Sequence, residues 1–328
     1  MKSYYIYTYG CQMNESDSER LAHQLESVGY VPTEEVDVAD LIILNTCCVR
    51  ETAENKIYGR IGELKHLKEK NKNLIIAITG CMAQKNQADM FKRAPHIDIV
   101  LGTHNIQHIN EMVKEVQRTK KRQVNVDMDN TVLPELAAKP NGTFFAWVPI
   151  MNGCNKFCTY CIVPHVRGRE ISRPVDAIVK DVRELGEKGF KEITLLGQNV
   201  NSYGLDFKDG TDFGTLVDAL DGIPGIERIR YMTSHPQDMT KGMVDALGRS
   251  SNIVTQLHLP VQSGSDNILK RMNRHYSVEK YKDLLQYCRE KIDGVTITTD
   301  IIVGFPGETE KDFQQTLQLL KDVRYDMA

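Results

Sequence analysis

The chain contains the sequence GCNKFCTYC at residues 153–161, in which Cys154, Cys158 and Cys161 have the spacing C-x-x-x-C-x-x-C. Three thiolates on one short loop can hold three irons of a cubane [4Fe–4S] cluster, which leaves the fourth iron open to a small molecule. An open coordination position is typical of reactive metal sites rather than structural ones. A zinc knuckle and three unrelated buried cysteines are the alternatives. Zinc prefers four ligands, usually in paired C-x-x-C units, and no second pair follows, so we favour the cluster.

The composition is that of a globular protein with room for two domains. The 328 residues are 41% hydrophobic and 26% charged. The net charge of −3 gives no global signature of nucleic-acid binding, so such a role would depend on local patches. No apolar run approaches membrane-spanning length, and residues 1–7 lack the apolar region of a secretory signal. The eight cysteines are too sparse for a disulfide scaffold, and we expect a reducing cytoplasm as the compartment.

The N-terminal part of the chain alternates apolar strands with amphipathic helices. We expect strands at 3–8, 40–46, 74–79 and 97–101, and helices at 15–28, 50–70, 83–92 and 108–119. This βαβα order predicts a parallel sheet with helices on its faces. We therefore expect an α/β, doubly wound, Rossmann-like domain over residues 1–120.

Three cysteines follow strands of this predicted sheet. Cys11, Cys47 and Cys81 come soon after the first, second and third strands. Because the carboxyl ends of parallel strands lie on one edge of a sheet, where ligands bind, we expect these thiols to converge on a second cluster site. Gly10 and Gly80 would let the backbone turn closely around the metal. The alternative is that the cysteines are small hydrophobic residues at strand ends.

Two further cysteines are less easily assigned. Cys48 is adjacent to Cys47, and neighbouring residues near a strand end point to opposite sides, so only one of the pair is expected to be a ligand. The residues alone do not choose between them. Cys288 lies in a helical stretch with Leu284 and Leu285 and is expected to be a buried core thiol.

The second half of the chain repeats the alternation after a polar linker. Residues 121–143 contain one plausible strand, at 123–126, and are expected to join two domains. Five strands are expected at 144–150, 192–196, 226–231, 254–257 and 295–302, with a sixth starting at 325. Helices are expected at 175–188, 215–220, 238–247, 266–272, 278–291 and 310–323. These units predict a partial (β/α)6 barrel over residues 144–328, cut off at its last strand.

Polar loops follow the predicted barrel strands, at the end where such folds bind ligands. Besides the 153–161 loop, they comprise residues 197–199, 233–236, 258–265 and 304–308. They are rich in Gly, Ser, Asn and Gln, which suits close binding of a polar ligand. Each could equally be a plain turn. Their common position at one end of the barrel favours the ligand interpretation.

The C-x-x-x-C-x-Φ-C motif after the first barrel strand resembles the radical SAM superfamily, with Tyr160 in the aromatic position. The resemblance implies that S-adenosylmethionine (SAM) binds the open iron and is cleaved to a 5′-deoxyadenosyl radical. Many radical SAM proteins have Gly-Gly-Glu after the second barrel strand to hold the SAM amino group. This chain has Gly197-Gln198-Asn199 there, so Gln198 or Asn199 would take that role. The SAM contacts implied in this way are Tyr160, Gln198, Asn199, Ser234, His235, Gln262 and Gly304.

The N-terminal motifs narrow the resemblance to the methylthiotransferase family, over essentially the whole chain. They are YGCQMN at 9–14, NTC at 45–47 and TGCMAQ at 79–84. The resemblance implies that Cys11, Cys47 and Cys81 hold an auxiliary [4Fe–4S] cluster that takes part in sulfur insertion. The family ligand is the cysteine after Asn-Thr, which selects Cys47 over Cys48. Two [4Fe–4S] clusters and SAM are therefore the expected cofactors.

Further motifs resemble the tRNA branch of this family. They are CTYCIVP at 158–164, RGRE at 167–170 and LLGQNVNSYG at 195–204. The match implies a transferase that adds a methylthio group to C2 of N6-dimethylallyladenosine at tRNA adenosine 37, next to the anticodon. We expect two uses of SAM, one to methylate the sulfur and one to supply the radical. Family members continue into a C-terminal TRAM domain that binds tRNA, and this sequence does not include it.

The resemblance also implies partners. They are the tRNA anticodon stem-loop, an electron donor such as flavodoxin or ferredoxin, and a sulfur source; we expect no membrane association and a monomer. Arg167, Arg169 and Arg173 follow the radical loop and could bind the stem phosphates. Ion pairing on a solvated loop is an equal alternative for them. Residues 65–72 and 114–122 are further basic patches, of which the first is expected to be a solvated helix face.

Three other functions are alternatives. A methylthiotransferase for another tRNA nucleoside or for a ribosomal protein is disfavoured by the resemblance of residues 195–204. A non-catalytic iron–sulfur electron carrier would need four cysteines per cubane, which two three-cysteine sites fit poorly. A zinc-stabilised RNA-binding module would hold zinc and no iron.

Overall fold

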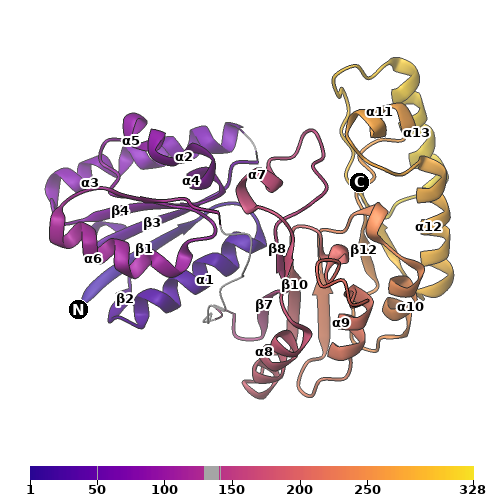
Figure 1. The fold of residues 1–328 in the computed structure, drawn as a ribbon, viewed down its shortest axis with the longest axis horizontal. Helices are drawn as coiled ribbons and strands as arrows, with labels where there is room; N and C mark the ends of the chain where they lie inside the picture. The colour runs from indigo at the N-terminus through magenta and orange to yellow at the C-terminus, as the bar shows by residue number, and fades with distance from the viewer. Residues whose placement is uncertain (50, 129–139, 141) are drawn as a thin grey trace. The chain divides into compact units, whose positions relative to one another are not determined.

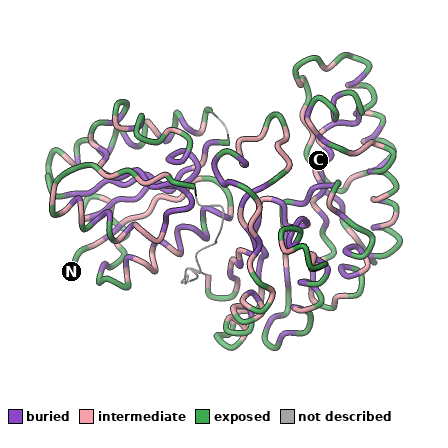
Figure 2. The backbone as a smooth tube through the Cα atoms, in the orientation of Figure 1, coloured by how far each residue is buried: buried purple, intermediate pink, exposed green. Residues whose placement is uncertain are grey.

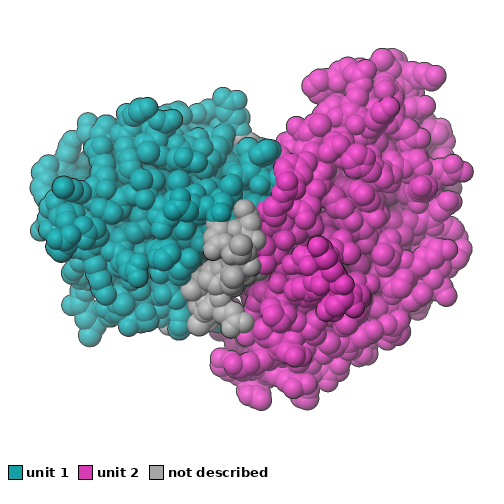
Figure 3. All heavy atoms as spheres, in the orientation of Figure 1, with its two compact units in different colours: residues 1–141, 162–168 teal, residues 142–161, 169–328 magenta. Residues whose placement is uncertain are grey.

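The structure, a computed structural model, describes residues 1–49, 51–128, 140 and 142–328. It divides into two compact units, drawn in separate colours in Figure 3. Unit 1 comprises Met1–Asn141 and Ile162–Gly168, and unit 2 comprises Gly142–Cys161 and Arg169–Ala328. Much of the predicted linker at 121–143 lies outside the described residues. Within the described part of the chain, no helix has the length and apolarity needed to cross a membrane.

Unit 1 is built on a six-stranded sheet in which all neighbouring strands are parallel. Its strands are β1 (Lys2–Thr8), β2 (Tyr30–Pro32), β3 (Leu41–Thr46), β4 (Ile75–Gly80), β5 (Ile99–Leu101) and β6 (Gln123–Asn125). The spatial order is β2-β1-β3-β4-β5-β6, which is the flavodoxin-like variant of the doubly wound fold. The strand order reverses between β1 and β3, and ligands of such sheets bind outside the carboxyl ends at this point.

Helices cover both faces of this sheet, which confirms the predicted doubly wound architecture (Figure 1). One face carries α1 (Gln12–Glu26) and α6 (Ile109–Thr119). The other carries α2 (Glu51–Glu63), α3 (Lys65–Lys70), α4 (Cys81–Asn86) and α5 (Met90–Arg93). The central strands β3 and β4 are consequently buried along their whole length, as Figure 2 shows in purple. Burial on both faces explains why they read as continuous apolar runs rather than alternating ones.

The boundaries of unit 1 differ from the sequence-based expectation in three places. The unpredicted β2 ends in Pro32, which an edge strand tolerates because its N–H groups need no partner on the outer side. The strand expected in the linker is β6, which pairs with β5 as the sixth strand of this sheet. Helices α1 and α4 begin at Gln12 and Cys81, earlier than expected, so each starts at a candidate ligand.

Unit 2 consists of parallel strands that alternate with helices, which confirms a partial barrel of βα units. Strands β7 (Phe145–Pro149), β10 (Glu192–Leu196) and β11 (Arg228–Tyr231) form one sheet, and β12 (Gln256–His258) pairs with β13 (Thr296–Thr298). The helices are α8 (Val175–Glu187), α9 (Phe213–Leu220), α10 (Lys241–Arg249), α11 (Asp266–Arg271), α12 (Val278–Lys291) and α13 (Glu310–Val323). A parallel bridge between Thr298 and Met327 marks the start of the sixth strand. Cys288 is fully buried in the core, as predicted.

A segment between β7 and α8 interrupts the barrel pattern. It contains the antiparallel pair β8 (Met151–Asn152) and β9 (Ile171–Ser172), and the short helix α7 (Val163–Arg167). Residues Ile162–Gly168 of this segment belong to unit 1, although the residues on either side belong to unit 2. Single 3-10 turns occur at η1 (Val36–Val38), η2 (Gln87–Asp89), η3 (Ile106–His108), η4 (Val200–Ser202) and η5 (Pro236–Asp238).

Candidate functional site

Unit 1 brings Cys11, Cys47 and Cys81 together at one edge of its sheet; we call these the unit 1 triad. Cys11 is the N-cap of α1 after β1, Cys47 follows β3, and Cys81 opens α4 directly after β4. The three thiols are close enough to influence one another electrostatically. They lie at the carboxyl ends of three adjacent strands and include both strands that flank the reversal of the strand order. This is the ligand-binding position of a doubly wound sheet.

Polar side chains from the same motifs brace these strand ends. Nδ2 of Asn14 donates to the carbonyl of Tyr9 at 2.7 Å and to that of Thr46 at 3.1 Å. Nδ2 of Asn45 donates in turn to the carbonyl of Asn14 at 2.8 Å. Oγ1 of Thr46 donates to the carbonyl of Thr79 at 2.5 Å. Asn14, Asn45 and Thr46 are fully buried, so these bonds tie the three strand ends into one rigid group.

Two glycines allow the cysteine loops to approach one another. Gly10 has a φ of +115°, and a Cβ at this position would lie 2.6 Å from Cβ and 3.2 Å from Sγ of Cys47. Gly80 has a φ of +87°, and its Cβ would lie 2.3 Å from the carbonyl oxygen of Thr46. Both positions therefore require glycine for conformation and for space.

The thiols of this edge have unequal acidity. A hydrogen bond from the Cys48 thiol, together with the Arg167 guanidinium, lowers the pKa of Cys81 to about 6. Burial raises the pKa of Cys47, and its neighbours Cys81 and Cys11 raise it further. Donation to Cys81 and burial raise the pKa of Cys48, which packs in the core between the sheet and α2. Cys48 is therefore a protonated donor to Cys81 rather than a fourth thiolate at this edge.

Arg167 also lies at this edge, which the sequence did not predict. Its Nη2 forms an ion pair with Oδ2 of Asp17 at 2.8 Å and donates to Oδ1 of Asn14 at 2.8 Å. Asp17 and Asn14 lie on α1, whereas Arg167 ends α7. No local pattern in the sequence links these residues, because the contact spans about 150 positions.

The donor set of the unit 1 triad fits an iron–sulfur cluster. Its three side chains are thiols, and soft thiolates are the ligands that hold such clusters. Gly10 and Gly80 let the loops turn closely beside one another. Among the described residues, no group of three His, Cys, Asp or Glu side chains is compact enough to hold one metal ion.

In unit 2, the cysteines of the 153–161 loop form the unit 2 triad. Gly153 has a φ of +82°, and its amide donates to Oε1 of Gln198 at 2.5 Å. Nζ of Lys156 forms an ion pair with Oδ1 of Asp238 at 2.5 Å. The other oxygen of Asp238 accepts from Nδ2 of Asn199 at 2.7 Å. Gln198 and Asn199 thus brace the loop from the end of β10, one directly and the other through Asp238.

Asn273 and Arg274, which follow α11, bind the same loop and were not predicted as site residues. Nδ2 of Asn273 donates to the carbonyls of Lys156 and Phe157 at 3.3 and 3.0 Å. Nη1 of Arg274, which is 5% exposed, lies 3.7 Å from Sγ of Cys158 and 3.1 Å from the hydroxyl of Tyr160. A cation beside a candidate ligand is an outer contact that can tune a metal site.

Among the thiols of the unit 2 triad, Cys154 has a pKa that is raised mainly by burial. Burial raises the pKa of Cys154 to about 12, and Glu170, Cys161 and Cys158 add to the effect. The mutual influence of the three thiols shows that the loop gathers them. Tyr160 is 40% exposed, and burial of part of its ring raises the pKa of its hydroxyl.

Three buried polar atoms at the ends of β10 and β11 have no hydrogen-bond partner among the described residues. They are Oδ1 of Asn199, Oγ of Ser234 and Nε2 of His235. The ring of His235 accepts at Nδ1 from the amide of Gln237, so Nε2 carries the proton. Burial lowers the pKa of His235 to about 2, which keeps the ring neutral. Native structures rarely leave such groups unpaired, and a bound polar ligand is one explanation.

The other predicted SAM contacts lie in turns with positive φ angles. Gln262 has a φ of +70° and Gly304 a φ of +76°. The backbone of Gln262 pairs with Asp300 and Ile302, at 2.9 Å each, beyond the ends of β12 and β13. The amide of Gly304 donates to Oε2 of Glu308. Their roles in SAM binding stay predictions.

The three predicted tRNA-binding arginines occupy different environments. Arg169 is exposed, with its guanidinium 4.4 Å from the ring centroid of Phe157. Arg173 donates to the carbonyl of Pro149 at 2.8 Å and pairs with Asp181 at 2.7 Å. Arg167 is buried in unit 1, as described above. Phosphate binding by the three stays a prediction.

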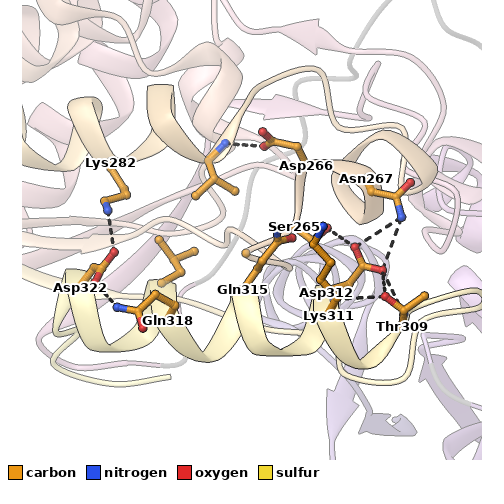
Figure 4. Close-up of a pocket in the computed structure, with 13 residues that line it drawn as sticks. Ser265, Asp266, Asn267, Lys282, Thr309, Lys311, Asp312, Gln315, Gln318 and Asp322 are labelled. Atoms are coloured by element: carbon orange, nitrogen blue, oxygen red, sulfur yellow. Dashed lines mark hydrogen bonds and ion pairs between the residues drawn. The ribbon is translucent and has the colours of Figure 1, made fainter.

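A cavity of about 580 Å³ in unit 2 contains none of the predicted cluster ligands or SAM contacts, although Gly264 and Ser265 of the predicted polar loop 258–265 line it (Figure 4). It lies among α11, α12 and α13, and its polar groups pair with one another. Lys282 pairs with Asp322 at 2.7 Å, and Asp312 accepts from Ser265 and Thr309 at 2.5 and 2.6 Å. This cavity therefore contributes no residue to either cysteine triad.

Solved structures with a similar fold belong to radical SAM enzymes. The chain matches the radical S-adenosylmethionine methyltransferase TsrM from Kitasatospora setae with a TM-score of 0.70 at 12% identity, over 99% of this chain and 74% of that one. It matches the cobalamin-dependent radical enzyme OxsB with a TM-score of 0.64 at 13% identity, over 98% of this chain and 52% of that one. At this identity the likeness shows the fold alone.

Family models cover both units of the chain. Residues 148–320 match the radical SAM superfamily, and residues 3–102 match the uncharacterized protein family UPF0004. The class of protein is thereby a radical SAM enzyme, which implies SAM and a [4Fe–4S] cluster as cofactors.

Curated relatives identify the family within that class. The chain is 50% identical to tRNA-2-methylthio-N(6)-dimethylallyladenosine synthase of Clostridium botulinum, over 99% of this chain and 73% of the relative. It is 49% identical to the synthase of that name from Pelotomaculum thermopropionicum, over 100% of this chain and 74% of the relative. The chain belongs to the tRNA-2-methylthio-N(6)-dimethylallyladenosine synthase family of methylthiotransferases.

Proposed function

We propose that this chain adds a methylthio group to C2 of N6-dimethylallyladenosine at tRNA adenosine 37. The observation that carries the proposal is a pair of three-cysteine sites, each at strand ends of its own unit, in a member of this synthase family. C2 of adenine carries an unactivated C–H bond, which acid–base or nucleophilic groups do not readily break. The clusters and SAM, when bound, supply the radical and sulfur chemistry that this bond demands.

The unit 2 triad would hold the cluster that binds SAM. Cys154, Cys158 and Cys161 provide three thiolates. Their loop is held by a hydrogen bond that Gln198 accepts from Gly153 and by two that Asn273 donates. A raised pKa at Cys154 means that this thiol gives up its proton as metal binds, so cluster formation there releases a proton.

The unpaired atoms of the barrel loops would receive the polar groups of SAM. Oδ1 of Asn199 and Oγ of Ser234 can accept from an ammonium group. Nε2 of His235 can donate to a carboxylate or a hydroxyl, and the ring stays neutral while it does so. Tyr160 is exposed beside Cys158 and is available to contact the ligand. These groups would orient SAM without exchanging protons with it.

The unit 1 triad would hold the auxiliary cluster. Cys47 supports this assignment better than Cys48, because its side chain faces Gly10 while Cys48 packs in the core and donates to Cys81. The lowered pKa of Cys81 favours the thiolate form that iron requires.

The partners and compartment follow from the same proposal. The substrate would be the anticodon stem-loop of tRNA, with exposed Arg169 as one phosphate contact. A cytoplasmic electron donor such as flavodoxin or ferredoxin and a sulfur source complete the reaction, and we expect the chain to act as a monomer.

Two experiments test the function. After anaerobic reconstitution we expect roughly eight irons per chain, the content of two cubanes. Zinc without iron would instead indicate a zinc-stabilised RNA-binding module. Nucleoside mass spectrometry of tRNA from cells that lack the full-length gene should show loss of 2-methylthio-N6-dimethylallyladenosine and accumulation of N6-dimethylallyladenosine. Persistence of the methylthio nucleoside would refute the substrate assignment.

A further inference from the structure

A buried cation adjoins the unit 1 triad. Arg167 and its ion-pair partner Asp17 are each 3% exposed. The guanidinium hydrogen-bonds to the thiol of Cys81 and interacts electrostatically with Cys11. One arginine side chain therefore pairs with α1, hydrogen-bonds to one candidate ligand and lies within electrostatic range of a second.

The position of Arg167 is fixed by its backbone as well as by its side chain. Its carbonyl oxygen lies 3.0 Å from Nε2 of His104. The preceding carbonyl, of Val166, accepts from Oγ1 of Thr103 at 2.6 Å, and the Val166 side chain is 1% exposed in the core of unit 1. These contacts fix the position of the Arg167 guanidinium, so this side chain has little freedom to reach a ligand in solvent.

Asp17 is shared between two arginines. Its Oδ2 pairs with Arg167 at 2.8 Å, and its Oδ1 lies 4.0 Å from Nη1 of Arg20. Three thiolates on a cubane would bring net negative charge to the same edge, which the guanidinium of Arg167 would help to balance.

We propose that Arg167 is a positioning residue of the auxiliary cluster, a fixed positive charge held by Asp17 and Asn14 that raises the reduction potential of the cluster. Reduction adds one electron and hence one negative charge, which a nearby cation stabilises. The inference rests on the proposed function, because it requires the unit 1 triad to hold a cluster. It assigns Arg167 a role different from the phosphate binding that the sequence suggested.

The test measures the auxiliary cluster alone. A background with Cys154→Ala, Cys158→Ala and Cys161→Ala removes the unit 2 triad, and the reconstituted chain is titrated with dithionite under electron paramagnetic resonance. Relative to this parent, Arg167→Gln should raise the ratio of oxidised to reduced cluster at a fixed potential about tenfold, or about 59 mV for one electron. Asp17→Asn removes the opposite charge and should shift the potential in the opposite direction.

The opposite signs separate an electrostatic role from a structural one. If Arg167 only supported the fold, both variants would loosen the same contacts and shift the potential, or lose iron, together. Arg118→Gln is the matched control, because it removes an exposed arginine of α6 that pairs with Glu115 and should leave the potential unchanged. Arg167→Lys retains the charge and should stay near the parent, which keeps the test decisive if Arg167→Gln does not fold.

Three results would overturn the inference. The first is an unchanged potential in Arg167→Gln at full iron loading. The second is a shift in the same direction in Arg167→Gln and Asp17→Asn. The third is weaker tRNA binding by Arg167→Gln with no change in potential, which would return the residue to the phosphate role. If the parent itself binds no iron, the proposed function fails first, so the two failures are distinguishable.

Discussion

The two cysteine triads of this chain are assembled in opposite ways. The unit 2 triad lies within one loop, at residues 154, 158 and 161, whereas Cys11 and Cys81 of the unit 1 triad are 70 positions apart. The loop can present its thiols with help from a few local bonds. The distributed triad exists only after β1, β3 and β4 pair, because the chain has to close long loops to bring the thiols together. The same donor set can therefore be encoded by a motif or by a fold.

The largest expected effect comes from a substitution of Gly10, which lies next to the unit 1 triad. Gly10→Ala places a Cβ 2.6 Å from that of Cys47 in a backbone conformation that alanine disfavours. We expect loss of roughly four of eight irons and of methylthio transfer, with the unit 2 triad still loaded. Iron analysis and nucleoside mass spectrometry measure both.

Gly29→Ala is the matched control for this variant. Gly29 also has a positive φ, +88°, but a Cβ there would meet nothing within 4 Å. Its backbone strain should leave the iron content unchanged. Full iron loading of Gly10→Ala would show that the strand ends are not packed as tightly around Cys47 as the structure indicates.

The unit 2 triad should be less sensitive to a single substitution, because several hydrogen bonds and ion pairs hold its loop. Arg274→Gln removes the cation beside Cys158 and Tyr160, and contacts of this kind typically change metal affinity or activity by about 10–100-fold. We expect a loss of that size in reductive SAM cleavage. Arg249→Gln, which removes an exposed arginine paired with Asp218, is the control and should have no effect.

A smaller effect is expected from the brace between strand ends in unit 1. Asn14→Ala leaves the part-buried carbonyl of Tyr9 and the buried carbonyl of Thr46 without their side-chain donor, which should destabilise unit 1 by about 2 kcal/mol. Hydrogen exchange of the β1 and β3 amides measures this in the metal-free chain. Asn55→Ala, at an exposed position of α2, should not change it. Equal exchange in both variants would rule out the bracing role.

The smallest expected effect is the pH dependence of the stability of unit 2, which depends on the buried His235. The folded state holds His235 with a pKa of about 2, against an ordinary value of 6.5. Below pH 6.5 the unfolded chain takes up a proton that the folded unit 2 does not, so stability falls as the pH falls. Between pH 6.5 and 5.5 this group should account for about 1 kcal/mol.

His235→Gln should remove that part of the acid sensitivity. Urea unfolding followed by the fluorescence of Trp147, the single tryptophan of the chain and a residue of β7, reports on unit 2. His66→Gln, an exposed histidine of unit 1, should leave the pH dependence of this signal unaltered. The same slope in all three proteins would mean that His235 has the same pKa in the folded and unfolded states.

Patterns of short range predicted much of the architecture. The alternation of strands and helices gave the parallel sheet of unit 1, the barrel units of unit 2 and the strand-end positions of Cys11, Cys47 and Cys81. Short or interrupted elements were not predicted from this alternation. Strand β2 has only three residues and ends in proline, and α7 has five residues within an insertion, so neither shows a hydrophobic period.

Contacts between distant segments could not be predicted in the same way. Nothing near Arg167 in the sequence indicates that Ile162–Gly168 belongs to unit 1 or that Asp17 is its partner. The hydrogen bonds from Asn273 and Arg274 to the 153–161 loop likewise join positions more than 100 residues apart. Single-sequence patterns report the local environment of a residue, not its partner across the fold.

The sequence by itself determined which cysteines are the candidate cluster ligands, because thiol spacing and strand-end position depend on covalent neighbours and on hydrophobic period. The tertiary structure alone decided how those residues are supported. It set the reversal of strand order between β1 and β3, the packing of Cys48 away from the unit 1 triad, and the buried charge of Arg167 beside it. These features arise from packing and electrostatics between segments that meet only when the chain is folded.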